Sequence, residues 1–196
     1  MGVPVINTGP MTVEEFYAFT DTRPDDEKWE LIDGEPNLNA APSRLHQRIV
    51  KNLVFSLAGI ERRPEMFWEV LPGLGVRVSE KNRPEPDVLI IPRGGRSLDA
   101  QERDRGDVIV ALEVLSPSTE HRDLRWKRTA YTSLPSLTHY IVIAQDAVDV
   151  VIFARANGFE EQRLHSLRDT VELPSLGVSL PLAEIYRDTG LADDRG

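Results

Sequence analysis

The run Val108–Leu115 constrains the fold more than any other segment. It reads Val-Ile-Val-Ala-Leu-Glu-Val-Leu and is apolar at successive positions, not only at alternate ones. Such a run is typical of a strand covered on both faces, so it predicts a central strand of a sheet. A lone buried carboxylate costs several kcal/mol. We therefore expect Glu113 to be paired, protonated or bound to a cation, unless the strand surfaces there and Glu113 is solvated.

Local signals elsewhere predict both helices and strands. Thr12 and Glu15 have the spacing of a capping box, and Asp33-Gly34 predicts a tight hairpin turn. Further expected elements are strands over 29–32, 35–38, 67–71, 75–78, 86–91, 140–144 and 148–153, and helices over 43–57, 120–133 and 182–186. The tail should add one short strand and a proline-rich loop. Helices before and after a largely central sheet predict a compact α/β or α+β domain.

The length of 196 residues favours one domain. We expect that domain over residues 12–187, with a loose arm over 1–11 and a tail over 188–196. The chain has no cysteine, which excludes disulfides, thiolate metal sites and a cysteine nucleophile. It shows no signal-peptide pattern and no apolar run near the ~20 residues of a membrane helix. These features predict a cytoplasmic protein with no membrane partner.

The net charge is −9 and the isoelectric point is near 5.0. This balance counts against a simple nucleic-acid-binding protein, which usually carries a basic face. It does not count against a metal-dependent nuclease, because a site rich in carboxylates adds negative charge that bound cations partly neutralise. No phosphate-binding glycine loop, dinucleotide fingerprint or serine nucleophile elbow is present.

Asp87 opens a second apolar strand directly after Pro86. If this strand neighbours the one that carries Glu113, both carboxylates can meet at one edge of the sheet. Two hard oxygen ligands with water are what Mg²⁺ or Mn²⁺ prefers. The pattern therefore predicts a metal site formed by Asp87 and Glu113. The alternative for Asp87 alone is a solvent-exposed residue at the start of a strand.

Lys127 is the third candidate. It shares a helical face with the apolar Leu124, Tyr131 and Leu134, so we expect it to point inward. An ammonium there could act on a phosphate or on an attacking water. The alternative is an exposed pair with Asp123 at i,i+4, worth only about 0.3–0.5 kcal/mol.

Several short motifs stand in a characteristic order along the chain. They are Trp29–Gly34 with Glu35, Pro42-Ser43 with His46, Pro86–Val88, Glu113–Thr119, Arg122-Asp123, Lys127-Arg128 and Tyr131. This order, from about Thr12 to Tyr186, resembles the Uma-type endonucleases. They are a large, mostly bacterial family of the PD-(D/E)xK, restriction-endonuclease-like superfamily. The string from Glu113 to Thr119 is its most specific part.

The resemblance implies a restriction-endonuclease-like fold, a mixed central β-sheet flanked by helices, and a homodimer. It implies Asp87 and Glu113 as metal ligands, together with the carbonyl of Val114. The superfamily places a lysine two residues after the second acid, where this chain has Leu115. Lys127, on the following helix, resembles a migrated replacement.

Two further positions match the family. Either Glu30 or Glu35 would complete the metal shell, and we favour Glu30 of the two. The alternative for Glu30 is an exposed strand residue. His46 shares a helical stripe with Ile49 and Leu53. It is therefore either a catalytic residue or, as is more common for a histidine on an apolar face, a satisfied core residue.

The function implied is metal-assisted hydrolysis of a DNA phosphodiester with Mg²⁺ or Mn²⁺. Lys127 would orient the attacking water or offset charge. Arg122, Arg125 and Arg128 would bind backbone phosphates, unless they form a solvated helix face. One alternative is a catalytically inactive nuclease-fold protein that binds nucleic acid or a protein partner. Another is an accessory protein that acts on RNA.

Overall fold

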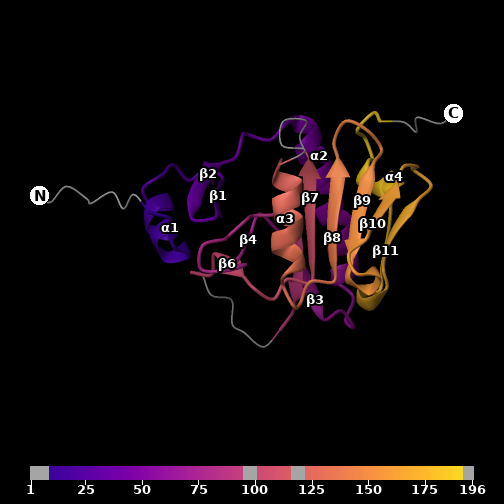
Figure 1. Ribbon diagram of the computed structural model, residues 1–196. Coiled ribbons are helices and arrows are strands. Elements are labelled where there is room, and N and C mark those ends of the chain that lie inside the picture. Colours follow the sequence, from indigo (N-terminus) through magenta and orange to yellow (C-terminus); the bar gives the residue numbers. More distant parts are fainter. Residues whose placement is uncertain (1–8, 95–100, 116–121, 192–196) are drawn as a thin grey trace, which may run out of the picture.

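The computed structural model describes residues 9–94, 101–115 and 122–191, with the backbone alone for 122–124. Its centre is a six-stranded sheet with the strand order β10-β9-β8-β7-β5-β3 (Figure 1). The strands are β3 (Trp68–Pro72), β5 (Val88–Pro92), β7 (Val110–Leu115), β8 (His139–Ala144), β9 (Val150–Ala154) and β10 (Glu161–Leu164). Strands β7 and β8 run parallel, and the other neighbouring pairs are antiparallel. The sheet is therefore mixed, as the sequence indicates.

Helices cover both faces of this sheet. Helix α2 (Arg44–Glu61) packs on one face together with the hairpin of β11 (Thr170–Leu173) and β12 (Val178–Pro181), and with the short α4 (Leu182–Ile185). Helix α3 (Arg122–Thr132) covers the other face. Along β7, Val110, Leu112 and Val114 join the core under α2, whereas Ala111 joins the core under α3. The prediction of a central strand buried on both faces is confirmed.

The N-terminal part forms a small unit beside the main sheet (Figure 1). It contains α1 (Val13–Thr20), β1 (Trp29–Ile32) and β2 (Glu35–Leu38), packed around Val13, Phe16 and Leu31. The predicted capping box at Thr12 is present. Asp33 and Gly34 form the predicted hairpin turn, with φ of 51° and 79°.

This unit joins the rest of the chain through backbone hydrogen bonds. Leu31 and Arg83 donate N–H groups to each other's carbonyls at 3.1 and 2.8 Å. Nearby, β4 (Gly75–Val76) and β6 (Asp104–Arg105) pair in parallel. Two 3₁₀ turns, η1 (Arg155–Asn157) and η2 (Pro174–Leu176), complete the described elements. These contacts fix β1 in place beside the start of β5.

The structure differs from the sequence predictions in three places, one of which is the short strand β6 at Asp104–Arg105, where no strand is expected. Helix α2 continues to Glu61 instead of ending at Leu57, because Val54, Ala58 and Ile60 still pack against the core. The tail contains β10 and the hairpin β11–β12, where we expected one strand. In the described part of the chain, no helix has the length and apolar character needed to cross a membrane.

Candidate active site

Asp87 lies where β5 and β7 separate. The two strands pair from Val88 with Leu112 to Ile90 with Val110. One step further, the Oδ2 of Asp87 accepts the N–H of Val114 at 2.8 Å. The Asp87 side chain thus accepts the N–H of Val114, which a backbone carbonyl would accept if the pairing of β5 with β7 continued. Its exposed fraction is 12%, so the alternative of an exposed strand-start residue is wrong.

Two basic groups contact the Asp87 carboxylate. Lys28 Nζ is 3.4 Å from Oδ1, and His46 Nε2 is 3.2 Å from Oδ2. Lys28 comes from the segment that enters β1, and His46 from the first turn of α2. Asp87 therefore joins the N-terminal unit, the central sheet and α2.

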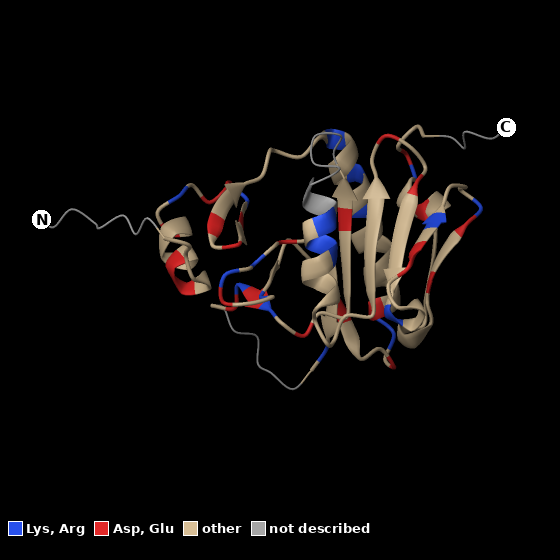
Figure 2. Ribbon diagram, in the orientation of Figure 1, with Lys and Arg blue, Asp and Glu red and all other residues tan. Residues whose placement is uncertain are grey.

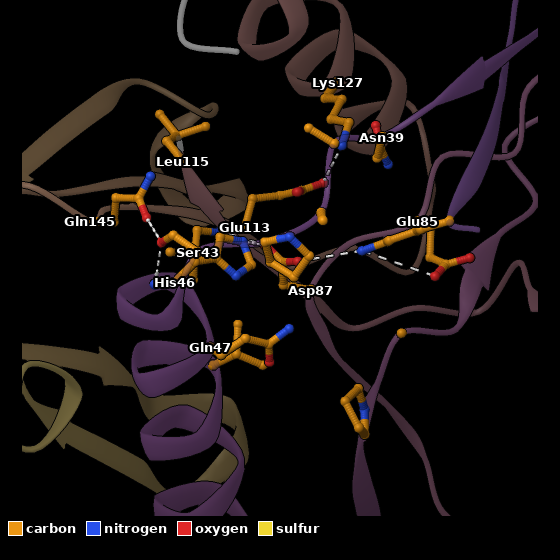
Figure 3. A pocket seen from close by; sticks show the side chains of 18 of the residues that line it. Asn39, Ser43, His46, Gln47, Glu85, Asp87, Glu113, Leu115, Lys127 and Gln145 are labelled. Carbon is orange, nitrogen blue, oxygen red and sulfur yellow. Dashed lines mark hydrogen bonds and ion pairs between the residues drawn. The ribbon is translucent and has the colours of Figure 1, made fainter. Parts of the chain in front are cut away.

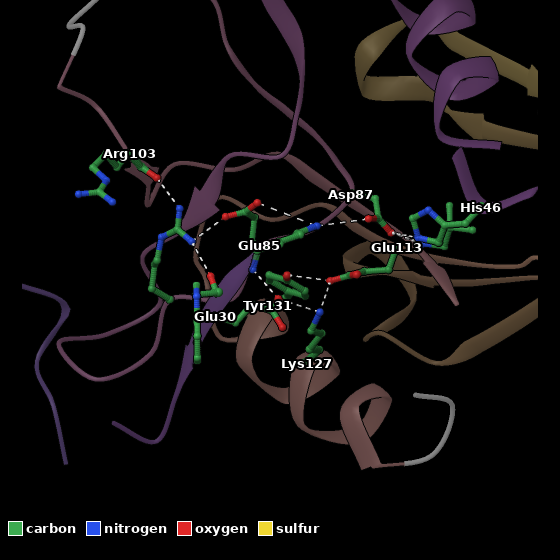
Figure 4. Close-up of polar contacts among 12 residues, drawn as sticks. Glu30, His46, Glu85, Asp87, Arg103, Glu113, Lys127 and Tyr131 are labelled. Carbon is green, nitrogen blue, oxygen red and sulfur yellow. Dashed lines mark hydrogen bonds and ion pairs between the residues drawn. The ribbon is translucent and has the colours of Figure 1, made fainter. Parts of the chain in front are cut away.

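Glu113 points from β7 towards α3 and is 7% exposed, so the alternative of a solvated Glu113 is wrong. Its Oε1 accepts hydrogen bonds from Lys127 Nζ at 2.9 Å and from Tyr131 Oη at 3.0 Å (Figure 4). Figure 2 shows the acidic band within β7 next to basic residues of α3. The buried carboxylate is thus paired, as its position in an apolar strand predicts.

Lys127 also reaches β1. Its Nζ is 2.9 Å from the Oε1 of Glu30, which accepts the backbone N–H of Glu85 at 2.7 Å. Glu30 is 2% exposed, whereas Glu35 is exposed on β2. Of the two glutamates considered from the sequence, only Glu30 is brought to this cluster. Lys127 bridges two buried carboxylates and points inward as its helical position predicts.

His46 is held at the start of α2. Ser43 caps the helix, and its Oγ accepts the backbone N–H of His46 at 3.0 Å. The Nδ1 of the same histidine is buried and has no hydrogen-bond partner among the described residues. His46 is therefore not a fully satisfied core residue, and its ring faces Asp87.

The two acids have pKa values shifted in opposite directions. Burial raises the pKa of the Glu113 carboxyl to about 7, although Lys127 opposes the shift, and the charge of Asp87 adds to it. Burial would also raise the pKa of Asp87, but the contacts with His46 and Lys28 outweigh it and hold that pKa at about 2. One acid is thus firmly ionised, and the other exchanges its proton near neutral pH.

The bridging lysine keeps its charge. Burial would lower the pKa of Lys127, but the carboxylates of Glu113 and Glu30 raise it well above its usual value. Burial would raise the pKa of Glu30, yet the charge of Lys127 and the N–H of Glu85 lower it. An ammonium is therefore fixed beside the two acids.

These groups surround a cavity of about 410 Å³ (Figure 3). Its polar lining includes Lys28, His46, Asp87, Glu113, Lys127 and Gln145. Tyr140, on β8, also lines it, and its buried hydroxyl has no partner among the described residues. The cavity is thus lined by acids and bases from the N-terminal unit, α2, the start of β5, β7 and α3, together with Tyr140 of β8.

A chain of ion pairs supports the site from the side of β1. Lys28 Nζ lies 4.0 Å from Glu85, whose other oxygen accepts from Arg83 at 2.7 Å. The guanidinium of Arg83 lies against Gly75, where an added Cβ would stand 2.1 Å from Nε. The sequence analysis missed Lys28, Arg83 and Glu85. No strand periodicity marks them, because Lys28 precedes β1, and Arg83 and Glu85 precede β5.

The three arginines of α3 differ. Arg125 is exposed. Arg128 donates to the carbonyl of Phe159 at 2.8 Å and lies over the ring of Phe153 at 4.3 Å, so it holds the segment after β9. The side chain of Arg122 lies outside the described residues, as do Ser116, Ser118 and Thr119 of the family string.

Within the described ranges, no group of three or more histidines and acids is placed to hold a metal ion. Asp87 and Glu113 nevertheless line one cavity and repel each other electrostatically. Mg²⁺ commonly takes one or two carboxylates and completes its shell with water and substrate phosphate. Two carboxylates and the Val114 carbonyl are oxygen donors of the type that such an ion takes, and Lys28 and Lys127 are competing cations.

A mixed sheet flanked by helices, with two acids where neighbouring strands diverge and a buried lysine beside them, defines an α/β protein with a buried charged site. The chain belongs to the family described as "Uma2: Putative restriction endonuclease", which matches residues 13–183. This match confirms the resemblance found in the sequence.

Two relatives extend this result. The fold is similar to a crystal structure described as "a putative nuclease belonging to DUF820" from Anabaena variabilis ATCC 29413. The TM-score is 0.72 at 15% identity, over 90% of this chain and 98% of that one, so the likeness concerns the fold. The chain is also 30% identical over 120 residues to "Uncharacterized protein slr1290" of Synechocystis sp. (strain ATCC 27184 / PCC 6803 / Kazusa). That match spans 59% of each protein's length.

Proposed function

We propose that this protein is a metal-dependent endonuclease that hydrolyses DNA phosphodiester bonds. The observation that carries the proposal is the position of Lys127, whose ammonium lies 2.9 Å from both Glu113 and Glu30 in a buried site. The superfamily needs a lysine beside its acids, and Leu115 cannot serve. A helix residue supplies the ammonium instead. Membership of a restriction endonuclease family supports the same function.

Each residue has a distinct task in this proposal. Mg²⁺ or Mn²⁺ would be held by Asp87, Glu113 and the Val114 carbonyl. When bound, the ion would lower the pKa of a bound water and stabilise negative charge on the phosphate oxygens. Lys127 places a fixed positive charge beside the phosphate oxygens. Glu30 holds Lys127 in place.

His46 and Lys28 act on Asp87. They orient its carboxylate and keep it ionised, so that it is ready to accept a cation. Arg125, exposed on α3, is the candidate contact for a backbone phosphate among the described arginines of that helix.

Cleavage by Lys127 variants tests the proposal. In single-turnover assays with Mn²⁺ on supercoiled, linear and single-stranded DNA, Lys127→Met should lower the rate by about 10²-fold or more. Lys127→Arg should not restore it, because a planar guanidinium does not replace a compact ammonium. Lys51→Met, on the exposed side of α2, is the matched control and should cleave normally. Equal rates in Lys127→Met and wild type would contradict the proposal.

Removal of Lys127 should affect stability as well as cleavage. An exposed lysine could be removed at little cost in stability, but Lys127 compensates two buried carboxylates. Its removal should therefore also destabilise the fold, as breaking a buried pair does. Rates must be compared at a temperature where circular dichroism shows each variant folded.

Metal binding tests the two acids separately. Mn²⁺ at about 100 times its Kd should stabilise the wild-type protein by about 2.7 kcal/mol. Asp87→Asn and Glu113→Gln should lose most of this gain, because each removes a charged ligand. The readout is the melting temperature with Mn²⁺ or with EDTA. An equal Mn²⁺-induced rise in wild type and both variants would place the metal elsewhere.

A second candidate function is a non-catalytic nuclease fold that binds nucleic acid or a protein partner. The observation in its favour is that the site acids already have cationic partners, with Lys28 at Asp87 and Lys127 at Glu113 and Glu30. Wild-type protein that binds Mn²⁺ and DNA but cleaves none of the substrates, RNA included, would favour this candidate.

A further inference from the structure

Lys28 lies between two acids at the edge of the site. Its Nζ is 3.4 Å from the Oδ1 of Asp87 and 4.0 Å from the Oε1 of Glu85 (Figure 3). Lys28 and Glu85 line the cavity of the site, and both also line a second cavity of about 270 Å³ next to α1. The ammonium of Lys28 therefore has open space on two sides.

Lys28 is held more loosely than Lys127. The ammonium of Lys127 is 2.9 Å from each of two carboxylates, and its side chain is 11% exposed. The contacts of Lys28 are longer than the about 2.7–2.9 Å of a charge-assisted hydrogen bond, and its side chain is 34% exposed. In the described part of the chain, this ammonium makes one hydrogen bond, to Asp87, although an ammonium has three donors. Lys28 thus has donors left for a ligand.

Both acids keep another partner if Lys28 moves. Asp87 lies 3.2 Å from the Nε2 of His46. Glu85 accepts a hydrogen bond from Arg83 at 2.7 Å. Movement of the ammonium away from Asp87 would therefore leave neither carboxylate buried without a basic partner.

A divalent cation and Lys28 compete for the same carboxylate. Asp87 is a metal ligand in the proposed function, and its Oδ1 already faces the ammonium. A cation held by Asp87 would repel Lys28, because like charges within about 4–6 Å interact strongly. Glu85, at 4.0 Å, is placed to attract the ammonium instead. We therefore expect Lys28 to leave Asp87 when a divalent cation binds there.

We propose that Lys28 is a phosphate-binding residue of the site, which leaves Asp87 when a divalent cation binds and then pairs with a phosphodiester of a nucleic-acid strand. The inference rests on the proposed function for the cation and for the strand. An ammonium on a flexible stem suits a phosphate, whose oxygens only accept hydrogen bonds. In the metal-free protein Lys28 holds Asp87 ionised, and in the metal-bound protein it holds the strand.

Calorimetric titration with Mn²⁺ in the absence of DNA tests the competition. Lys28→Met should bind Mn²⁺ about tenfold or more tightly than wild type, because a charge at this distance shifts carboxylate equilibria by about tenfold to a thousandfold. Lys28→Gln keeps a hydrogen-bond donor without the charge. It should show the same gain, which keeps the test valid if Lys28→Met does not fold. Lys51→Met, on the exposed side of α2, is the control and should bind Mn²⁺ as wild type does.

Fluorescence polarisation of a short, labelled thymidylate oligonucleotide tests the phosphate contact. Ca²⁺ replaces Mn²⁺, at a concentration at which gel electrophoresis shows the strand intact. With Ca²⁺, Lys28→Met should bind the strand about three- to tenfold more weakly than wild type. The slope of log K against log salt should fall by about 0.7, the value for one phosphate contact on a single strand. In EDTA, where Lys28 stays at Asp87, the two proteins should differ by less than about twofold. Lys51→Met should keep the wild-type ratio between the two buffers.

The outcomes separate this exchange from the proposed function. Unchanged or weaker Mn²⁺ binding by both Lys28 variants would show that Lys28 only orients Asp87, and would overturn the exchange while leaving cleavage untouched. An oligonucleotide affinity that Lys28→Met leaves unchanged, or lowers equally in Ca²⁺ and in EDTA, would overturn it as well. Inorganic phosphate that displaces the oligonucleotide at equal concentration would contradict the assignment to a strand. Both expected shifts in a protein that cleaves no nucleic acid would support the exchange and refute the nuclease, whereas a wild-type protein that binds no Mn²⁺ would refute both.

Discussion

The two faces of the central sheet contain different kinds of side chain. The face under α2 is packed almost entirely with hydrocarbon, from Leu53 and Leu57 to the hairpin β11–β12. The face under α3 is also apolar at its centre, but it buries Glu113 with Lys127 and Tyr131. A single strand, β7, supplies both faces with alternate residues. We infer that the face under α2 mainly stabilises the fold, whereas the face under α3 carries the buried charges that a reaction would require.

The largest effect should come from the apolar face. Leu53→Ala removes a fully buried side chain and should lower the free energy of unfolding by about 2–5 kcal/mol. Phe55→Ala, on the same helix but 78% exposed, is the control and should change it by less than about 0.5 kcal/mol. Urea denaturation measures both. A loss in Leu53→Ala as small as that in Phe55→Ala would contradict the conclusion that the face under α2 stabilises the fold.

The next effect concerns pH and belongs to the α3 face. Burial raises the pKa of Glu113 to about 7 from an ordinary 4.5. The folded metal-free protein therefore holds this proton more tightly than the unfolded chain. The contribution of this proton to the free energy of unfolding is fully present below about pH 4.5 and is lost as the pH rises through about 7. Between these limits the loss should be on the order of 3 kcal/mol, and Glu113→Gln should lack it.

Urea denaturation in EDTA from pH 4.5 to 8 measures this difference. Burial lowers the pKa of His139, which acts in the opposite direction, but it does so in both proteins and cancels. Asp87, with its pKa held at about 2, titrates below this range. Leu53→Ala should follow the wild-type pH curve at lower stability. Parallel curves for wild type and Glu113→Gln would contradict the prediction.

The smallest effect distinguishes two tyrosines on the same face. Tyr131 donates its hydroxyl proton to Glu113, whereas the buried hydroxyl of Tyr140 has no described partner. Tyr131→Phe should therefore cost about 1 kcal/mol of stability. Tyr140→Phe should be neutral or stabilising, because it removes an unsatisfied polar group. The rings stay in place in both variants, so equal losses in thermal or urea unfolding would show that packing and not hydrogen bonding decides.

Much of the fold was accessible from local patterns. The apolar run at Val108–Leu115 predicts the central strand, and the cap at Thr12 and the Asp33-Gly34 turn mark their elements correctly. The hairpin β11–β12 was missed because each strand buries only two side chains and no strong turn dipeptide joins the two strands. The helical extension to Glu61 was missed because its last apolar residues are only partly buried.

The site was accessible in part. Asp87, Glu113 and Lys127 stand out because each places a charge in an apolar pattern, and the structure brings them to one cavity. Their roles in catalysis and metal binding stay predictions. Lys28 and Gln145 gave no such signal. Their importance depends on contacts with residues 59 and 102 positions away, which no local periodicity encodes.

The contact between Arg83 and Gly75 limits how this protein can vary in sequence. A side chain at position 75 would displace the guanidinium, which holds Glu85, which in turn contacts Lys28 beside Asp87. The glycine is therefore tied to the site through three side chains. A substitution there would become acceptable only after Arg83 had shortened, and a shorter Arg83 would release Glu85. Substitutions at positions 75 and 83 are therefore coupled. Gly75 can be replaced only after Arg83 has changed, so the glycine determines the order in which substitutions can accumulate.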